Sequence, residues 1–150
     1  MYEKSIVHHI AKWVIEIMFY CGIVCTVLVP FTIGSLIKYF SYSPQCESVY
    51  RITLTLAGVC AVYILFNIKK MYKTLLDGSP FVDKNVTAFR RMAVAAALIC
   101  VIFIVQSILA FTVGSVTIAL IFAIACLFCL TLKDLFKQAI NYKTENDLTI

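Results

Sequence analysis

The sequence predicts an all-α integral membrane protein, a bundle of four transmembrane helices with both termini cytoplasmic and helices two and three extended into the cytoplasm as a hairpin. Three observations predict this fold. Hydrophobic residues make up 62% of the 150 residues, well above the roughly 45 to 50% typical of soluble domains. They gather in four long runs with few charges, each long enough to cross about 30 Å of hydrocarbon. The Lys and Arg residues, in turn, gather on one side of these runs.

The distribution of Lys and Arg predicts the orientation. Two of them lie before the first apolar run, six between the second and third runs, and three after the fourth, which places eleven on one side. Only Lys38 and Arg51 lie on the other side. Short loops rich in Lys and Arg remain in the cytoplasm. We therefore expect a single membrane domain over residues 1–150, with both termini on the cytoplasmic side.

The first two spans are expected at about residues 13–37 and 50–68. The first run is too long for the apolar region of a signal peptide, so it is predicted to remain as a span. Pro30 and Gly34 should kink this helix in its outer half. The second helix should continue to Leu76, because apolar residues beyond the span still follow the spacing of one helical face.

Residues 68–92 form the predicted cytoplasmic hairpin. Ser79 followed by Pro80 has the pattern of an N-cap and a first-turn proline, so the third helix is expected to open at about Pro80. It should enter the membrane and span it at about residues 93–111. The short uncharged turn that follows, FTVGSVT, predicts a tight connection to the fourth span.

The fourth span is expected at about residues 116–132, and a cytoplasmic tail at 133–150. The tail begins as an amphipathic extension and ends in the acidic and apolar sequence ENDLTI. Asn146, Leu148 and Ile150, with the terminal carboxylate, have the form of a peptide that a groove rich in backbone donors captures. A frayed terminus is the alternative interpretation.

Two polar residues within the spans are candidate functional residues. Glu16 lies about one turn inside the first span, where a carboxylate is energetically expensive and therefore suggests function. The structural alternative is that its side chain reaches the membrane interface or pairs with a basic residue near the start of the third helix. Gln106, in the outer part of the third span, either lines a cavity or forms hydrogen bonds between helices.

The hairpin supplies the other candidates. Pro80 and Phe81 are expected to start the third helix and to act as an apolar staple, and Phe81 is also a candidate for partner contact. Arg90 and Arg91 are suited to an acidic partner or an anionic lipid, with solvated or headgroup-bound side chains as the alternative. Together with Asn85, these residues are the candidate partner-binding residues of the hairpin.

Catalytic and metal chemistry are not expected. The sequence holds no Gly-rich phosphate loop, no HExxH motif and no paired carboxylates within a span, so we expect neither an enzyme nor a cofactor. Six of the seven cysteines fall inside apolar runs and only Cys46 lies in the outer loop. Buried cysteines of this kind usually behave as small apolar residues. No metal site is therefore expected.

One central motif and the end of the chain resemble a known family. The motif G-x-P-F-x-x-x-N-V-x-x-x-R comprises Gly78, Pro80, Phe81, Asn85, Val86 and Arg90. Together with the ending ENDLTI and the four spans, it resembles the bacterial membrane family of domain of unknown function 2975. The resemblance covers essentially the whole chain.

The resemblance implies a regulatory function. Members of the family are often encoded beside a small helix-turn-helix regulator of the Cro/C1 type, which implies a signalling protein that binds such a regulator at the bacterial cytoplasmic membrane. The expected partners are the lipid bilayer, this cytoplasmic transcription regulator and further copies of the chain. No direct contact with nucleic acid is expected. The alternative hypothesis is a small membrane transporter, or an immunity or resistance protein against membrane-active compounds.

Overall fold

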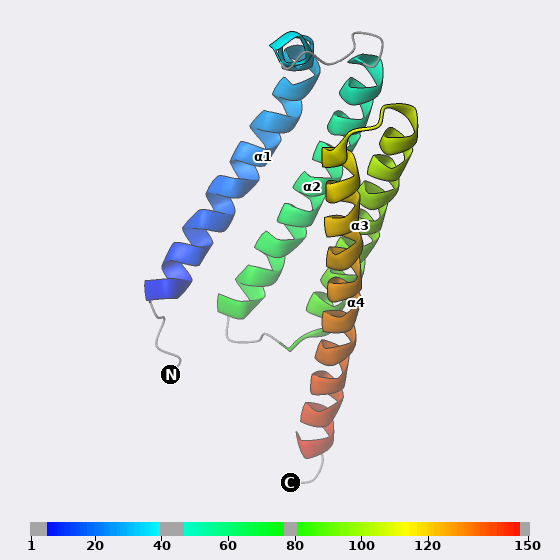
Figure 1. Cartoon of the computed structure of the whole chain (residues 1–150). Coiled ribbons are helices and arrows are strands. Elements are labelled where there is room, and N and C mark those ends of the chain that lie inside the picture. Colours follow the sequence, from blue (N-terminus) through cyan, green and yellow to red (C-terminus); the bar gives the residue numbers. More distant parts are fainter. Residues whose placement is uncertain (1–5, 40–46, 77–80, 148–150) are drawn as a thin grey trace.

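The computed structural model describes residues 6–39, 47–76 and 81–147, and within these ranges it contains four α-helices and no strand (Figure 1). The helices are α1 (Ile6–Tyr39), α2 (Glu47–Leu76), α3 (Asp83–Leu109) and α4 (Val113–Asp147). All four are long and apolar enough to cross a membrane. The all-helical architecture with four candidate spans is therefore confirmed.

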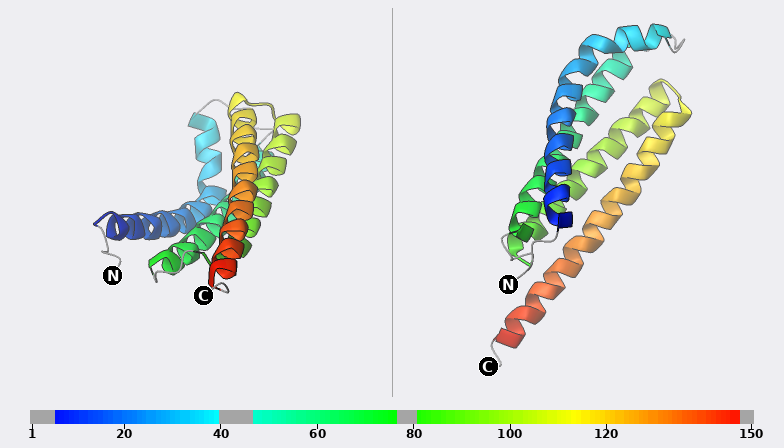
Figure 2. Two further views of the ribbon diagram at one scale, coloured as in Figure 1. Left: turned by 90° about the horizontal axis from the view of Figure 1, so that it is seen from below. Right: turned by 90° about the vertical axis from the view of Figure 1, so that its left-hand side faces the viewer.

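Neighbouring helices run antiparallel, so that the chain's cations gather at one end of the molecule. The start of α1, the end of α2, the start of α3 and the end of α4 all lie at this end, which we call the basic end (Figure 1). The α4 helix has 35 residues, which corresponds to about 52 Å. It projects beyond the other three helices at the basic end (Figure 2).

Helix α3 lies at the centre of the packing. It packs most extensively against α4 and also packs against α2, whereas α1 packs mainly against α2. Ala57 of α2, Ile99 and Phe103 of α3, and Ala119 of α4 form the buried apolar cluster. Among the described side chains of α1, only those of Ile33 and Ile37 are buried. The α1 helix is therefore a peripheral helix attached to a three-helix unit.

Small residues allow α1 and α2 to approach closely. A Cβ atom added at Gly58 would lie 2.8 Å from the Thr26 hydroxyl oxygen, and one added at Gly22 would lie 3.2 Å from a Leu65 methyl carbon. Thr26 is fixed by donating a hydrogen bond of 2.8 Å to the Gly22 carbonyl. In a membrane, small residues at such positions allow backbone-level packing that lipid cannot replace.

We call the end of the molecule opposite the basic end the outer end. There, the last part of α1 bends over the ends of the other helices (Figure 2). Pro30 lies inside α1, where it removes a backbone hydrogen bond and kinks the helix. Beyond the bend, Ile33 and Ile37 are buried. A Cβ added at Gly34 would lie 3.1 Å from a carboxylate oxygen of Glu47. The kink expected in this part of the helix is confirmed.

The predicted start of α3 was wrong by three residues. The helix begins at Asp83, not at Pro80, because Val82 has an extended backbone (φ −132°, ψ 148°) and accepts a hydrogen bond from the Asn85 amide. Asp83 places a carboxylate in the first turn, where the helix dipole favours negative charge. Ser79 and Pro80 themselves lie outside the described residues. The predicted end of α2 at Leu76 is confirmed.

The connection between α3 and α4 is as short as predicted. Only three residues separate the two helices, and the Thr112 hydroxyl accepts a 3.3 Å hydrogen bond from the Ser115 amide as an N-cap,. Helix α4 begins at Val113, three residues before the predicted span. It then continues without interruption to Asp147, so the tail predicted at 133–150 is helical over nearly all of its length.

Large apolar side chains cover the outside of the helices. The exposed fraction of the side chain is 67% for Trp13, 80% for Phe31 and 78% for Ile108. Contiguous apolar surface of this kind is rare on soluble monomers. It is the surface that a helix presents to lipid, and it supports the assignment of a multi-pass membrane protein.

Candidate functional site

The inner part of the α2–α3 pair at the basic end contains two buried asparagines. Asn67 of α2 and Asn85 of α3 are each only 2% exposed. The Thr74 hydroxyl lies 2.9 Å from Oδ1 of Asn85 and thereby connects the two helices. Asn67 donates a 2.8 Å hydrogen bond to the Tyr63 carbonyl. The predicted partner-binding residue Asn85 thus has a structural contact, and its side chain is not on the exposed surface.

A polar pocket of about 340 Å³ opens beside these asparagines. Cationic side chains line it from both helices, with Lys70 on α2 and Lys84 and Arg91 on α3, whereas Asp83 is the only acidic lining residue among those that the structure describes. Amide and hydroxyl groups of Asn67, Thr74, Asn85 and Thr87 complete the polar lining. The excess of cations and neutral hydrogen-bonding groups favours an anionic ligand or an acidic partner.

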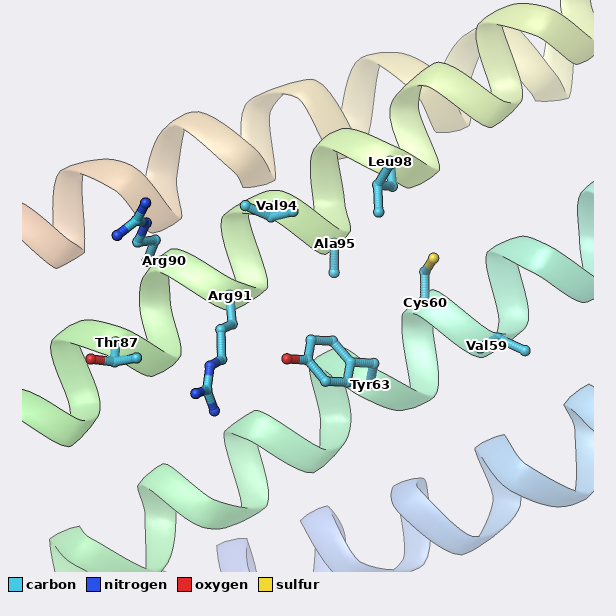
Figure 3. A pocket seen from close by; sticks show the side chains of 9 residues that line it. All are labelled: Val59, Cys60, Tyr63, Thr87, Arg90, Arg91, Val94, Ala95 and Leu98. Atoms are coloured by element: carbon cyan, nitrogen blue, oxygen red, sulfur yellow. The ribbon is translucent and has the colours of Figure 1, made fainter.

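An apolar groove of about 460 Å³ continues from this pocket along the α2–α3 interface (Figure 3). The groove and the polar pocket share Thr87 and Arg91 as lining residues. Figure 3 shows Arg91 extending toward α2 and the Tyr63 ring, whereas Arg90 points away from α2. Apolar side chains line the remainder of the groove: Val59, Cys60, Val94, Ala95 and Leu98. Both arginines line the groove, and only Arg91 also lines the polar pocket.

Aromatic contacts connect the start of α3 to the projecting part of α4. The Phe136 ring lies 5.4 Å from that of Phe81 and 5.0 Å from that of Phe89, measured between centroids. Phe89 is buried, whereas Phe81 remains 46% exposed. Phe81, which precedes α3, thus has a ring contact with α4. The start of α3 and the α4 extension consequently form one packed unit.

Glu16 forms an interhelical ion pair, although not with the predicted helix. Its carboxylate lies 3.7 Å from the Lys69 ammonium of α2, whereas a basic residue near the start of the third helix was expected. That expectation was wrong because α1 packs mainly against α2. Lys69 also lies 5.2 Å from the ring centroids of both Phe19 and Tyr20, a distance at which cation–π attraction operates.

A second basic pocket of about 530 Å³ surrounds this ion pair between α1 and α2. Within the described parts of the chain, four lysines line it and Glu16 is the only acidic lining residue; the lysines are Lys12, Lys69, Lys70 and Lys73. Lys70 also lines the polar pocket on the other side of α2. The two pockets together form a continuous cationic region across the basic end.

Gln106 lies at the opposite, outer end of α3 and lines a cavity of about 260 Å³. It is 4% exposed, and its Oε1 atom has no hydrogen-bond partner within the described residues. The neighbouring hydroxyls of Ser107 and Ser115 lie 2.7 Å apart and connect α3 to α4. The hydrogen bonding between helices that was expected here is therefore formed by Ser107 and not by the Gln106 side chain.

Some predicted site residues fall outside the described residues or outside any cluster. Pro80, Leu148 and Ile150 are not among the described residues. Asn146 is exposed near the end of α4. Within residues 6–39, 47–76 and 81–147, no three His, Cys, Asp or Glu side chains gather in a group that could hold a metal ion. The six cysteines described are all unpaired thiols.

Sequence reasoning missed three residues of the basic end. One is Asn67, whose side chain is buried. The other two connect elements: Thr74 through its hydrogen bond to Asn85, and Phe136 through its ring contacts. The sequence could have indicated Asn67 and Thr74, because two polar residues seven positions apart lie on the same face of a helix. It could not have indicated Phe136, since its partners come from another helix.

The fold and the basic end define a class: a multi-pass α-helical membrane protein with a cationic end. Within that class, the chain belongs to the family of proteins of unknown function DUF2975, whose sequence profile matches residues 7–150. The resemblance noted in the central motif and the ending is thereby confirmed over almost the full chain. No curated protein and no solved structure matches the chain.

Proposed function

We propose that this chain is a non-enzymatic regulatory protein of the bacterial cytoplasmic membrane, and that its basic end binds a cytoplasmic helix-turn-helix transcription regulator. In this proposal the basic end faces the cytoplasm, because eleven Lys and Arg residues in the sequence lie on that side,. The start of α3 and the end of α2 extend beyond the bilayer as the hairpin.

The observation that carries the proposal is the aromatic contact between the hairpin and the α4 extension. Because Phe136 packs against both Phe81 and Phe89, the two projecting elements present one surface. Phe81 is 46% exposed there, and the first turns of α3 carry the exposed cations Lys84 and Arg90. An exposed aromatic residue surrounded by cations is suited to an acidic protein surface with an apolar pocket.

Co-purification tests the proposal. The full chain, extracted in mild detergent, is used to capture a small DNA-binding protein from a lysate of the cells that express it. Replacing Phe81 with Ala, or deleting residues 146–150, should reduce capture at least tenfold. Phe111→Ala is the matched control, since Phe111 is an exposed aromatic residue at the outer end. Equal capture by all variants, or unchanged target transcription on deletion of the gene, would contradict the proposal.

The transporter or resistance hypothesis is supported by the cavity beside Gln106 and by the intramembrane position of Glu16. The ion pair with Lys69 offers a structural role for Glu16 instead. Export or resistance assays separate the two hypotheses, because a Glu16→Gln variant with full activity would remove the carboxylate from any transport mechanism. Loss of activity with normal membrane insertion would favour transport.

A further inference from the structure

The cavity beside Gln106, which we call the outer cavity, is lined by residues of all four helices, including the bent end of α1. Ile33 and Ile37 reach it from α1, Leu54 from α2, Phe103 from α3 and Ile118 from α4. Its volume is about 260 Å³, larger than the roughly 150 Å³ of an apolar cavity that holds benzene. Its size therefore allows a small organic molecule to enter.

Gln106 lines this cavity with a buried amide whose oxygen lacks a hydrogen-bond partner among the described residues. The side chain is 4% exposed and the Oε1 atom has no partner within the described part of the chain. The nearby hydroxyls of Ser107 and Ser115 are already engaged, because they lie 2.7 Å from each other and each lies 2.7 Å from a backbone carbonyl, so that one donates to the other and the other donates to its carbonyl. Buried polar groups of this kind are normally satisfied, so a group from outside the chain would complete the site.

The lining determines the chemistry of that group. Among the residues that the structure describes, no acidic or basic side chain lines the cavity, and most of the lining residues are apolar, so a charged ligand would lose its hydration without finding a counter-charge there. A hydroxyl both donates and accepts. It therefore satisfies the Gln106 amide whichever of its two ends faces the cavity.

We propose that the outer cavity binds a small uncharged molecule with one hydroxyl group and an apolar body, such as a medium-chain alcohol or a phenol. The hydroxyl bonds to the Gln106 amide, and the apolar body packs against Phe103 and Ile118. Ile33 and Ile37, from the bent end of α1, line the cavity and add to the apolar surface that the ligand contacts. Binding at this site does not depend on the proposed cytoplasmic partner.

Photolabelling of the full chain tests the binding site. The protein, in nanodiscs of phosphatidylethanolamine and phosphatidylglycerol, is irradiated with a diazirine derivative of 1-octanol, and mass spectrometry locates the adducts. We expect adducts on the cavity residues of α3 and α4, with competition by 1-octanol but not by 1-chlorooctane. Gln106→Leu should reduce this labelling about tenfold, the equivalent of one hydrogen bond. Gln138→Leu is the control, because Gln138 is an exposed glutamine on α4.

A second pair of variants keeps the test decisive if Gln106→Leu fails to fold. Gly114 lines the cavity, and a Cβ added there meets nothing within 4 Å. Gly114→Leu should therefore occupy the cavity and abolish labelling, whereas Gly114→Ala should retain it. Labelling that is spread over the lipid-facing surface and unchanged in Gln106→Leu and Gly114→Leu would overturn the proposal. Equal competition by 1-octanol and 1-chlorooctane would also overturn it, and would assign the Gln106 amide to water.

Discussion

The Glu16 carboxylate of α1 lies 3.7 Å from the Lys69 ammonium of α2, and this pair joins a peripheral helix to the centre of the basic end. Lys69 simultaneously faces the rings of Phe19 and Tyr20. An intramembrane carboxylate that sequence alone marks as a functional suspect thus has a cationic partner on the neighbouring helix. The pair lies in the wall of the larger basic pocket, so its geometry also determines the charge that this pocket presents.

Reversing the charge at Glu16 should weaken the attachment of α1, and a second reversal should restore it. Both side chains are about one-third exposed, at 34% and 35%, so solvent screening limits the pair to about 1 kcal/mol at most. Glu16→Lys should lower Tm in detergent by about 2 to 4 °C. The double variant Glu16→Lys, Lys69→Glu should recover most of the loss.

The control for this exchange is Lys143→Glu, at an exposed position near the end of α4. It should leave Tm within about 1 °C of the parent, since surface substitutions seldom change stability by more than about 0.5 kcal/mol. A double variant no more stable than Glu16→Lys would show that the observed pair does not form.

Removing the Thr74 hydroxyl should destabilise the α2–α3 pair. Thr74→Val keeps the shape of the side chain but leaves Asn85, which is 2% exposed, without this partner. The loss in free energy of unfolding should be about 0.5 to 1.5 kcal/mol, the net contribution of one hydrogen bond. Thr87→Val is the control, because Thr87 is exposed and bonds only within α3. Chemical unfolding in detergent, followed by circular dichroism, measures both, and equal losses would contradict the assignment.

The sequence was sufficient to predict the helices but not the contacts between them. The four apolar runs and the helical spacing up to Leu76 predicted the elements, because the hydrocarbon thickness sets the length of a span. Within a span, however, residues facing lipid and residues facing a neighbouring helix are equally apolar, so periodicity does not identify the packed face. The partner of Glu16 was therefore assigned to the wrong helix. The contact of Phe81 with Phe136 was likewise not expected, because it depends on how α4 projects past α3.

Shortening Phe136 should loosen the start of α3. Phe136→Ala removes the ring that packs against Phe81 and Phe89, and we expect a loss of about 1 to 3 kcal/mol because the ring is only partly buried,. Hydrogen exchange should accelerate at residues 83–89 while the middle of α3 stays protected. Leu135→Ala, at a 54% exposed neighbouring position, is the control and should leave exchange unchanged. Uniform acceleration along α3 would instead indicate global destabilisation.

Adding a methyl group at Gly58 should push α1 away from α2. The new Cβ would lie 2.8 Å from the Thr26 hydroxyl oxygen and 3.0 Å from its methyl carbon, and Thr26 cannot rotate away without losing its bond to Gly22. We expect Gly58→Ala to cost about 1 to 3 kcal/mol. Thr26→Ala in the same chain should recover part of this loss. If Gly58→Ala is as stable as the parent, the two helices are farther apart than the structure shows.

Labelling from outside intact cells should distinguish the two ends of the molecule. Single cysteines are placed in a cysteine-free chain at Lys84, at the basic end, and at Val113, at the outer end; both positions are exposed. An impermeant maleimide should modify Val113→Cys but should reach Lys84→Cys only after the cells are permeabilised, because the positive-inside rule places the cation-rich end in the cytoplasm. The reverse pattern would place the basic end outside the cell, out of reach of any transcription regulator. Lys133→Cys, on α4 three residues before Phe136, extends the test. It should be labelled under the same conditions as Lys84→Cys, because Phe136 packs against Phe81 and Phe89 at the start of α3.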